Sequence, residues 1–263
     1  MKSLLSFFLI IFSFKVLASS FFVYNAGEGL FARVITEKYS VLIDTGSLFE
    51  IRKNLLKLKK NNNFIITDVI LTHLHADHSS GIFEILDEFP RVNIYDNCMT
   101  NINVDDGDLM RWTDQFLKTL PKRMCINDKT KLIFDDVLIE TLWPTGNFKS
   151  KNHNHYSLVL KITTKQKSVL VMGDALASTE KWLIENKLDK LKNIDVLVVG
   201  HHGSDAASTK IFLDIVNPNM AVIPANKNNI RGYPSYKTIN RIKSLGINFW
   251  ITGIHGDFQL KLN

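Results

Sequence analysis

The run from Thr72 to His78, Thr-His-Leu-His-Ala-Asp-His, holds three histidines and one aspartate. Imidazole nitrogen and carboxylate oxygen are ligands that zinc and its first-row neighbours take at about 2 Å. Alternation along a loop cannot bring all four side chains to one point, but His73 and His75 can face one metal while Asp77 and His78 face a second. The run therefore predicts one wall of a two-metal site, with a solvated polar loop as the alternative.

The flanking residues predict how this run is held. Residues 68–71 have the apolar composition of a short buried strand, so the ligands lie where that strand ends. The apolar spacing over residues 79–88 predicts an amphipathic helix directly afterwards.

One loop cannot complete two metal shells, so further ligands are expected beside other strands. Residues at such places are Asp174, His201, His202, His153 and His155, with Asp44 as a partner that orients a histidine or the ligand loop. Each has a plainer interpretation: Asp174 as a helix cap, Asp44 as a turn former, and the histidine pairs as exposed turn residues. Taken together, clusters beside several apolar strands favour a common metal site.

Short apolar strands alternate with helices along the whole chain, without repeats or low-complexity tracts. The order predicts two sheets packed face to face with helices outside them, in one domain. Strands are predicted at residues 21–24, 30–36, 40–44, 68–71, 92–95, 137–142, 157–163, 168–172, 196–199, 220–223, 248–252 and 258–262, and helices at 51–60, 79–88, 108–120, 179–186, 210–216 and 236–244.

The N-terminus has the pattern of an export signal. Lys2 precedes an apolar stretch, and Val16-Leu17-Ala18 offers small residues for cleavage after Ala18. A retained membrane anchor is the alternative, but the stretch is short for a span of about 20 residues. We therefore predict a signal peptide at residues 1–18, a mature domain at 19–263 without a stable membrane span, and a periplasmic or secreted location.

Composition excludes a disordered or fibrous chain, since 45% of the 263 residues are hydrophobic. Cleavage removes Lys2 and Lys15 and no acidic residue, so the net charge falls from +6 to +4. This mild basicity is compatible with an anionic substrate such as nucleic acid, and equally with a solvated lysine-rich surface. Cys98 and Cys125 are the only cysteines, and a disulfide and two buried thiols are both open.

These residues, in this order, resemble the metallo-β-lactamase superfamily over essentially the whole mature chain. The resemblance implies an α/β fold, the four-layer αββα sandwich, and a metal-dependent hydrolase. The family's motifs map onto the Asp-Thr-Gly turn at Asp44, whose carboxylate would orient a ligand, and onto the ligands of the His-x-His-x-Asp-His loop, a histidine at 155 or 153, a bridging Asp174, and a histidine at 201 or 202.

We assign two divalent cations, zinc or manganese, to this site. His73, His75 and His155 are assigned to one cation, Asp77, His78 and His201 to the other, and Asp174 as the bridge. Such a pair lowers the pKa of a bridging water to give a metal-bound hydroxide. Asp77, Asp174 and His202 are the expected catalytic residues, with Asp44, His153 and Ser204 in supporting or substrate-binding roles.

Within the superfamily, the chain is most similar to the hydrolase domain of ComEC-type competence proteins, through Asn25-Ala26-Gly27-Glu28-Gly29, Trp143-Pro144, Gly173-Asp174 and His201-His202-Gly203-Ser204. That resemblance implies a nuclease or other phosphodiesterase acting on DNA, with single-stranded DNA or another phosphodiester as the bound partner. The chain departs from those proteins in its own export signal, in lacking channel helices, and in Tyr233-Pro234 where they tend to have His-Pro. The alternatives are a hydrolase of lactones, β-lactams or thioesters, and a non-catalytic metal-binding domain.

Overall fold

The computed structural model describes residues 18–60, 64–98, 107–146, 148–227 and 229–263. The predicted signal peptide at residues 1–18 lies outside these ranges except for Ala18. No helix in the described ranges is both long and apolar enough to cross a membrane.

Two seven-stranded sheets form the centre of the molecule. The first has the order β14 (Phe258–Lys261), β1 (Ser20–Val23), β2 (Ala32–Ile35), β3 (Ser40–Ile43), β4 (Asp68–Ile70), β5 (Asn93–Asp96) and β6 (Arg123–Cys125). The second has the order β13 (Asn248–Ile251), β12 (Met220–Ile223), β11 (Val196–Val198), β10 (Ser168–Val171), β9 (Val159–Thr163), β8 (Val137–Trp143) and β7 (Lys131–Phe134).

The two sheets have the same plan. In the first, pairing is antiparallel from β14 to β3 and parallel from β3 to β6. In the second, pairing is antiparallel from β7 to β10 and parallel from β10 to β13. Parallel strands end at the same edge of a sheet, so β3 and β4 deliver their following loops together, as do β10 and β11.

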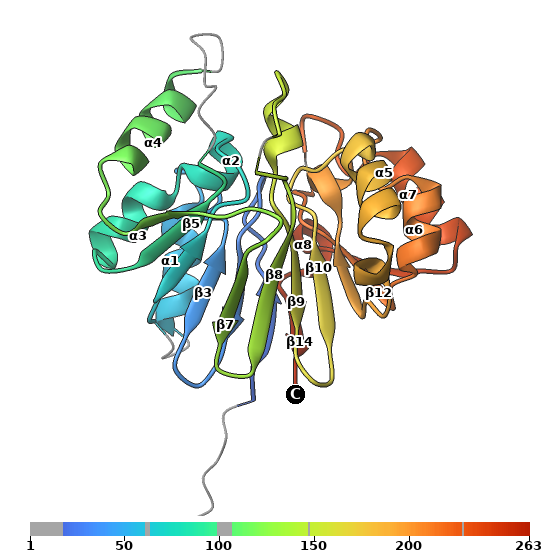
Figure 1. Ribbon diagram of the computed structural model, residues 1–263, viewed down its shortest axis with the longest axis horizontal. Helices are drawn as coiled ribbons and strands as arrows, with labels where there is room; N and C mark the ends of the chain where they lie inside the picture. The colour runs from blue at the N-terminus through green and yellow to red at the C-terminus, as the bar shows by residue number, and fades with distance from the viewer. Residues whose placement is uncertain (1–17, 61–63, 99–106, 147, 228) are drawn as a thin grey trace, which may run out of the picture.

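Helices cover the outer face of each sheet, which completes four layers (Figure 1). Over the first sheet lie α1 (Ile51–Lys60), α3 (Ile82–Glu88) and α4 (Asp108–Lys118), and over the second lie α5 (Ala177–Asn186), α6 (Lys210–Val216) and α7 (Tyr236–Ser244). Short helical turns are α2 (Ala76–Ser79), α8 (Thr252–His255), η2 (His153–Tyr156), η3 (Leu188–Leu191) and η4 (Gly200–Gly203). The predicted αββα sandwich is thereby confirmed.

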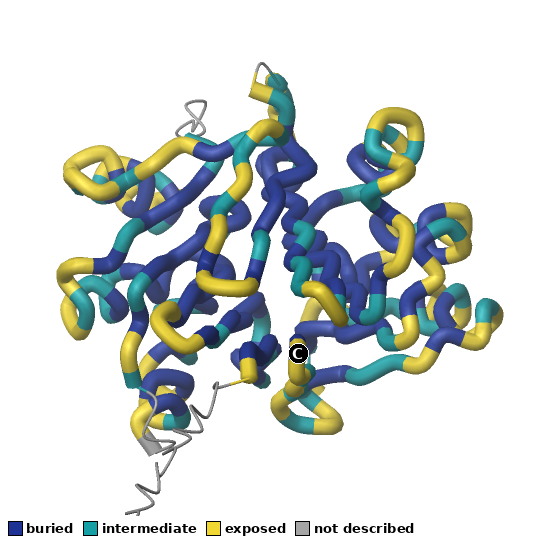
Figure 2. Tube along the Cα trace, turned by 60° about the horizontal axis from the view of Figure 1, so that its bottom comes forward, coloured by how far each residue is buried: buried dark blue, intermediate teal, exposed yellow. Residues whose placement is uncertain are grey.

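Three apolar clusters separate these layers. One lies between the sheets and includes Val34, Ile70, Leu160 and Val198, and each of the other two lies between one sheet and its helices. Figure 2 shows the consequence: buried residues run through the strands, whereas exposed residues gather on the outer helices and the loops. Burial of apolar surface on both faces of both sheets is the main force that holds the sandwich together.

Each predicted strand and helix has a counterpart, with two kinds of difference. Two short edge strands, β6 and β7, were not predicted, because β6 is partly exposed along its length and β7 exposes Ile133, so neither shows a clean apolar alternation. The predicted helix at 79–88 is divided between α2 and α3. Gly81 stands at the division, where an added Cβ would lie 2.5 Å from the carbonyl oxygen of Thr45.

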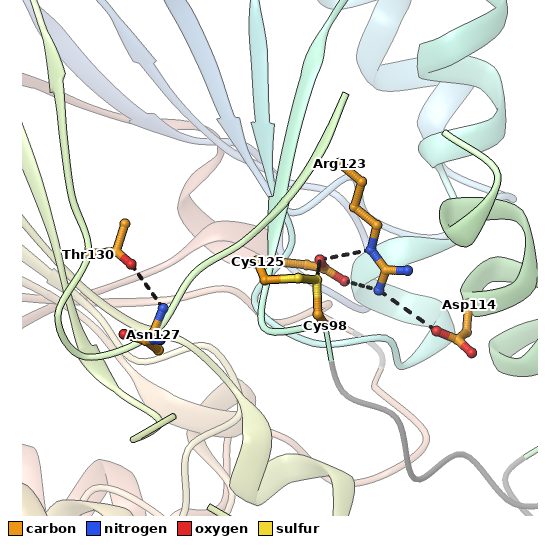
Figure 3. The surroundings of a disulfide bond; sticks show 7 residues. Cys98, Asp114, Arg123, Cys125, Asn127 and Thr130 are labelled. Carbon is orange, nitrogen blue, oxygen red and sulfur yellow. Dashed lines mark hydrogen bonds and ion pairs between the residues drawn. A yellow bond between two sulfur atoms is a disulfide. The ribbon is translucent and has the colours of Figure 1, made fainter. Parts of the chain in front are cut away.

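A disulfide joins Cys98, just after β5, to Cys125 in β6 (Figure 3). Arg123 ties the same two strands together, since its guanidinium donates to both carboxylate oxygens of Asp96 at 3.0 and 2.7 Å. The sequence left open whether the cysteines form a disulfide or remain as two buried thiols, and the structure shows the disulfide. A disulfide holds β6, which has little apolar surface to bury, at the edge of the first sheet.

Replacing both cysteines by serine is expected to lower the free energy of unfolding by about 2–4 kcal/mol, because the unfolded chain would lose a cross-link between residues 27 apart. Urea denaturation with and without reductant would measure this. Reductant should shift the wild-type midpoint and leave that of the double variant unchanged; an unshifted wild type would contradict the prediction.

Candidate metal centre

The ligand-bearing loops come from four strand ends that meet at one edge of the sandwich. Asp44 follows β3, residues 73–78 follow β4, Asp174 follows β10, and His201 and His202 follow β11 within η4. Turn α2, which belongs to the second of these loops, lies in the upper part of the view in Figure 1. In α/β sheets, ligands bind beyond the carboxyl ends of parallel strands, and here the two sheets supply one side of the site each.

The first candidate ligand group consists of His73, His75 and Asp174. The nitrogen and oxygen atoms that these residues could offer a metal all lie within 4.8 Å of one another. Nε2 of His73 lies 2.9 Å from Nδ1 of His75 and 3.7 Å from Oδ2 of Asp174. His73 is 1% exposed and Asp174 is 2% exposed, so these donors are shielded from water.

The second group consists of Asp77, His78 and His202, within the same limit of 4.8 Å. Nε2 of His78 lies 3.1 Å from Nε2 of His202, and the two nitrogens lie 3.1 and 3.3 Å from Oδ1 of Asp174. Asp77 places Oδ2 3.7 Å from Nε2 of His202. Asp174 therefore turns one carboxylate oxygen toward each group.

The buried carboxylate of Asp44 fixes one histidine in each group. It accepts hydrogen bonds from the backbone N–H and the hydroxyl of Thr72 at 2.6 and 2.7 Å, and it lies 2.7 Å from Nδ1 of His78. The Thr72 hydroxyl donates its proton to Asp44. The hydroxyl oxygen of Thr72 can therefore only accept a hydrogen bond from Nδ1 of His73, which lies 3.1 Å away. His73 and His78 thus carry protons on Nδ1 and aim Nε2 at the site.

His202 is oriented in the same way by a backbone carbonyl. Its Nδ1 lies 2.8 Å from the carbonyl oxygen of Pro224, which can only accept, so Nδ1 holds the proton and Nε2 faces His78. Two ring nitrogens and a carboxylate oxygen therefore converge in a space where only a positive charge relieves their mutual repulsion. Nitrogen and oxygen donors without thiolate suit Zn²⁺ or Mn²⁺, so the residues present fit a divalent cation.

A proton on His78 would relieve the same repulsion between ring nitrogens and the carboxylate oxygen in the absence of a metal. Burial lowers the pKa of His78, but the carboxylates of Asp174 and Asp44 outweigh this and hold the pKa well above its ordinary value. His73 lacks so close a carboxylate, and burial with the neighbouring His78 holds its pKa well below the ordinary value. Binding of a cation at Nε2 of His78 would therefore compete with protonation of this ring.

The close approach of two loops depends on glycine. Gly29 has φ of +115°, and a Cβ added there would lie 1.9 Å from the carbonyl oxygen of Asp77. Gly173, beside Asp174, has φ of +52°, and its added Cβ would lie 2.3 Å from the hydroxyl of Ser157, which accepts from the N–H of Asp174 at 2.7 Å. A side chain at Gly29 would clash with the backbone of Asp77, and one at Gly173 would crowd Ser157 and Thr72.

Gly29→Ala is expected to lower the free energy of unfolding by more than about 2 kcal/mol and to weaken metal binding, because a backbone clash adds to a left-handed strain of about 1–2 kcal/mol. Gly246→Ala is the matched control, since Gly246 has φ of +69° and nothing within 4 Å of an added Cβ. Thermal unfolding of the metal-free and metal-loaded variants would measure both effects. Equal destabilisation by the two substitutions would show that contact with Asp77 is unimportant.

Two predicted histidines of the 153–155 segment lie apart from these groups. Nδ1 of His155 is 2.9 Å from the hydroxyl of Ser150, and its Nε2 is 3.2 Å from the hydroxyl of Ser178. The ring of His153 is nearer the site, with its centroid 6.1 Å from that of His75. The structure brings neither into the two ligand groups.

The adjacent histidines after β11 point in different ways. His201 and His202 both have left-handed backbones, with φ of 47° and 55°, and only His202 enters a ligand group. Nε2 of His201 stays 3.7 Å from Oδ2 of Asp174, at the wall of the cleft. Ser204 is buried, and its hydroxyl accepts from the N–H of Ala206 at 3.3 Å.

Sequence reasoning missed four contributors to the site: Thr72, Pro224, Asn154 and Arg231. Thr72 opens the ligand run, but its hydroxyl bonds to Asp44, which lies 28 residues earlier, so no local signal marked its role. Nδ2 of Asn154 lies 3.5 Å from Nε2 of His201, and its amide oxygen is buried without a hydrogen-bond partner. Arg231 lies far along the chain, and Nη1 reaches Oδ2 of Asp77 at 3.1 Å.

A cleft of about 720 Å³ opens over the ligand groups. Its lining includes His75, Asp77, Asp174 and His201, together with Glu28, Ser47, Phe49, Glu50, Ala76, Gly107, Asp108, Leu109, Met110, Asn226 and Arg231. Five of these side chains are carboxylates and one is an arginine, so the lining attracts cations. An anionic substrate would therefore depend on bound cations and on Arg231 for its attraction.

Comparison with known proteins agrees with this geometry. The family model described as "Metallo-beta-lactamase superfamily" matches residues 30–96, which include Asp44 and the ligand run. The chain is 27% identical over 241 residues to Competence protein ComA of Neisseria gonorrhoeae, covering 91% of this chain and 32% of ComA. It is 26% identical over 222 residues to Recombination protein 2 of Haemophilus influenzae, covering 83% of this chain and 26% of that protein.

The chain thus spans about a third or less of the length of these relatives. Among solved structures, Zn²⁺-bound PqqB from Methylobacterium extorquens aligns with a TM-score of 0.61 at 12% identity, covering 92% of this chain and all of PqqB. At that identity the likeness concerns the fold alone.

Proposed function

This chain has the metallo-β-lactamase fold and resembles the ComEC-type hydrolases of that superfamily, and from this premise we propose that it is an exported, dinuclear phosphodiesterase acting on DNA. Metal-dependent hydrolysis is the general chemistry of such a site. DNA as the substrate, two cations as the cofactor and export are the parts that we add.

The proposed ligands are the two groups that the structure brings together. His73, His75 and Asp174 would hold one cation, and Asp77, His78 and His202 the other, with Asp174 between them. When bound, two divalent cations lower the pKa of a water molecule and polarise the scissile oxygen. The observation that carries the proposal is the pair of Asp174 oxygens, one turned to each group.

The remaining polar groups would orient the metal ligands or bind the substrate. Asp44 and the Pro224 carbonyl keep the ligand nitrogens aimed at the site, which removes the need to reorganise them during a reaction. His201 lies at the cleft wall beside Asp174, where it would contact the group being cleaved. Arg231 would bind a substrate phosphate, because its guanidinium can offer two parallel N–H donors to phosphate oxygens.

DNA is favoured over other esters by the names of the relatives and by the positively charged side chain of Arg231 in the cleft. ComA is named as a competence protein and Recombination protein 2 as a recombination protein, and both match across most of this chain. Carboxylates in the lining would repel a nucleic acid until divalent cations neutralise them, so DNA binding should require metal.

Export is supported by the predicted signal at residues 1–18 and by the disulfide, since disulfides persist in oxidising compartments such as the periplasm. We take residues 19–263 as the mature hydrolase domain.

A cleavage assay tests the proposed function. The protein is stripped with a chelator, reloaded with Mn²⁺ or Zn²⁺, and given labelled single-stranded DNA beside nitrocefin and a panel of lactones. We expect DNA cleavage by the reloaded protein and none by the stripped protein. Turnover of nitrocefin or a lactone without any phosphodiester cleavage, under every metal tested, would overturn the proposal.

A further inference from the structure

We propose that Phe49 is a stacking platform for a nucleobase of single-stranded DNA, placed at the edge of the metal centre. This inference rests on the proposed function, and it concerns how the substrate is recognised rather than which bond is cut.

Phe49 is highly exposed and lies in the cleft over the candidate metal centre. Its side chain is 90% exposed, although an aromatic ring of this size ordinarily gains from burial. It follows the Asp44 turn and precedes α1, so the loop that presents it is anchored next to the metal ligands. It lines the same cleft as His75 and Asp174.

The two halves of the molecule give the cleft two different walls. Phe49 and Leu109, the latter from α4, belong to the half built on the first sheet and supply apolar surface. Arg231 and Asn226 follow β12 in the second sheet and supply a cation and an amide. Carboxylates share this lining, and Arg231 pairs with Asp77 at 3.1 Å and with Glu28 at 3.9 Å. A ligand with a flat apolar face and an anionic group could use both Phe49 and the guanidinium of Arg231.

A nucleotide with an unpaired base is such a ligand. Its base can stack on an aromatic ring without regard to sequence, because every base has a π face, while its phosphate pairs with arginine. In duplex DNA the base faces are covered by their neighbours, so Phe49 would favour single strands. The carboxylates around Phe49, including Glu50 and Asp108, make the same surface unsuitable as an apolar protein-docking patch.

The test compares two substrates for the metal-loaded protein: a single-stranded oligonucleotide, and one of equal length whose nucleotides are abasic. Phe49→Ala should lower kcat/KM on the first about 5- to 100-fold and leave the second nearly unchanged, because only the first has bases to stack. Phe49→Trp should retain cleavage, whereas Phe49→Leu, which is apolar but has no ring, should resemble the alanine variant. Tyr236→Ala is the control, an aromatic residue 79% exposed and outside the cleft lining, and should match the wild type on both substrates.

An equal fall on both substrates would overturn the inference, since Phe49 would then act through the shape of its loop. Wild-type activity in Phe49→Ala or in Phe49→Leu would overturn it as well. If the wild-type protein cleaves neither substrate with Mn²⁺ or Zn²⁺, the proposed function itself fails, and that result is distinct from cleavage that ignores the bases.

Discussion

Asp174→Asn is expected to abolish the binding of both cations and to reduce kcat for phosphodiester cleavage by about 10³-fold or more. The expectation follows from the position of the carboxylate, whose Oδ2 faces His73 and whose Oδ1 faces His78 and His202. An amide offers one oxygen, carries no charge, and turns an N–H donor toward one of the groups. Both cations lose a ligand by this single change.

Metal content by mass spectrometry and steady-state cleavage rates would measure the effect. The fold should survive, because asparagine has nearly the same volume and circular dichroism would report any loss. Asp189→Asn, at an aspartate whose side chain is 94% exposed, is the control and should retain both cations. Two cations per chain in Asp174→Asn would contradict the bridging role.

His202→Ala and His155→Ala are expected to differ sharply. His202→Ala should lose the cation of the second group and reduce kcat by about 10²-fold or more, because that cation would retain only Asp77, His78 and the bridging Asp174. His155→Ala should keep both cations and nearly all activity, since its ring nitrogens meet Ser150 and Ser178 instead. If His155 and His201 are the ligands, as the sequence assignment has it, His155→Ala should lose a cation and His202→Ala should keep both.

The same two measurements, metals per chain and kcat, distinguish these assignments. His201→Ala completes the set: it should keep both cations but cleave more slowly, because His201 lies at the cleft wall. Loss of a cation in His155→Ala, with both retained in His202→Ala, would show that metal binding rearranges the loops.

The main features of the fold could be predicted because their signals are local, and the same local signals placed the His73–His78 run where a strand ends. A run of apolar residues ending in Gly173-Asp174 predicts both a strand and a ligand presented at its end. The choice between His201 and His202 could not be predicted, because both residues have left-handed backbones and the direction of each ring depends on contacts such as that with the Pro224 carbonyl.

Other contributors to the site are non-local, and sequence spacing carries no trace of them. Arg231 meets Asp77 across 154 residues of sequence, and this contact exists only because both loops reach the same cleft. The shared hydrogen bonds of Asp44 depend on the parallel pairing of β3 with β4, which places Asp44 beside Thr72. Pairing partners are set by the whole sheet rather than by the strand itself.

The central claim is that two cations occupy the two ligand groups, and an anomalous difference map from crystals grown with Mn²⁺ tests it most directly. We predict two peaks about 3.5–4 Å apart. One should lie against His73, His75 and Asp174, and the other against Asp77, His78, His202 and the same Asp174. A single peak, a peak against His155 beside His73 and His75, or a peak against His201 in place of His202 would contradict the account.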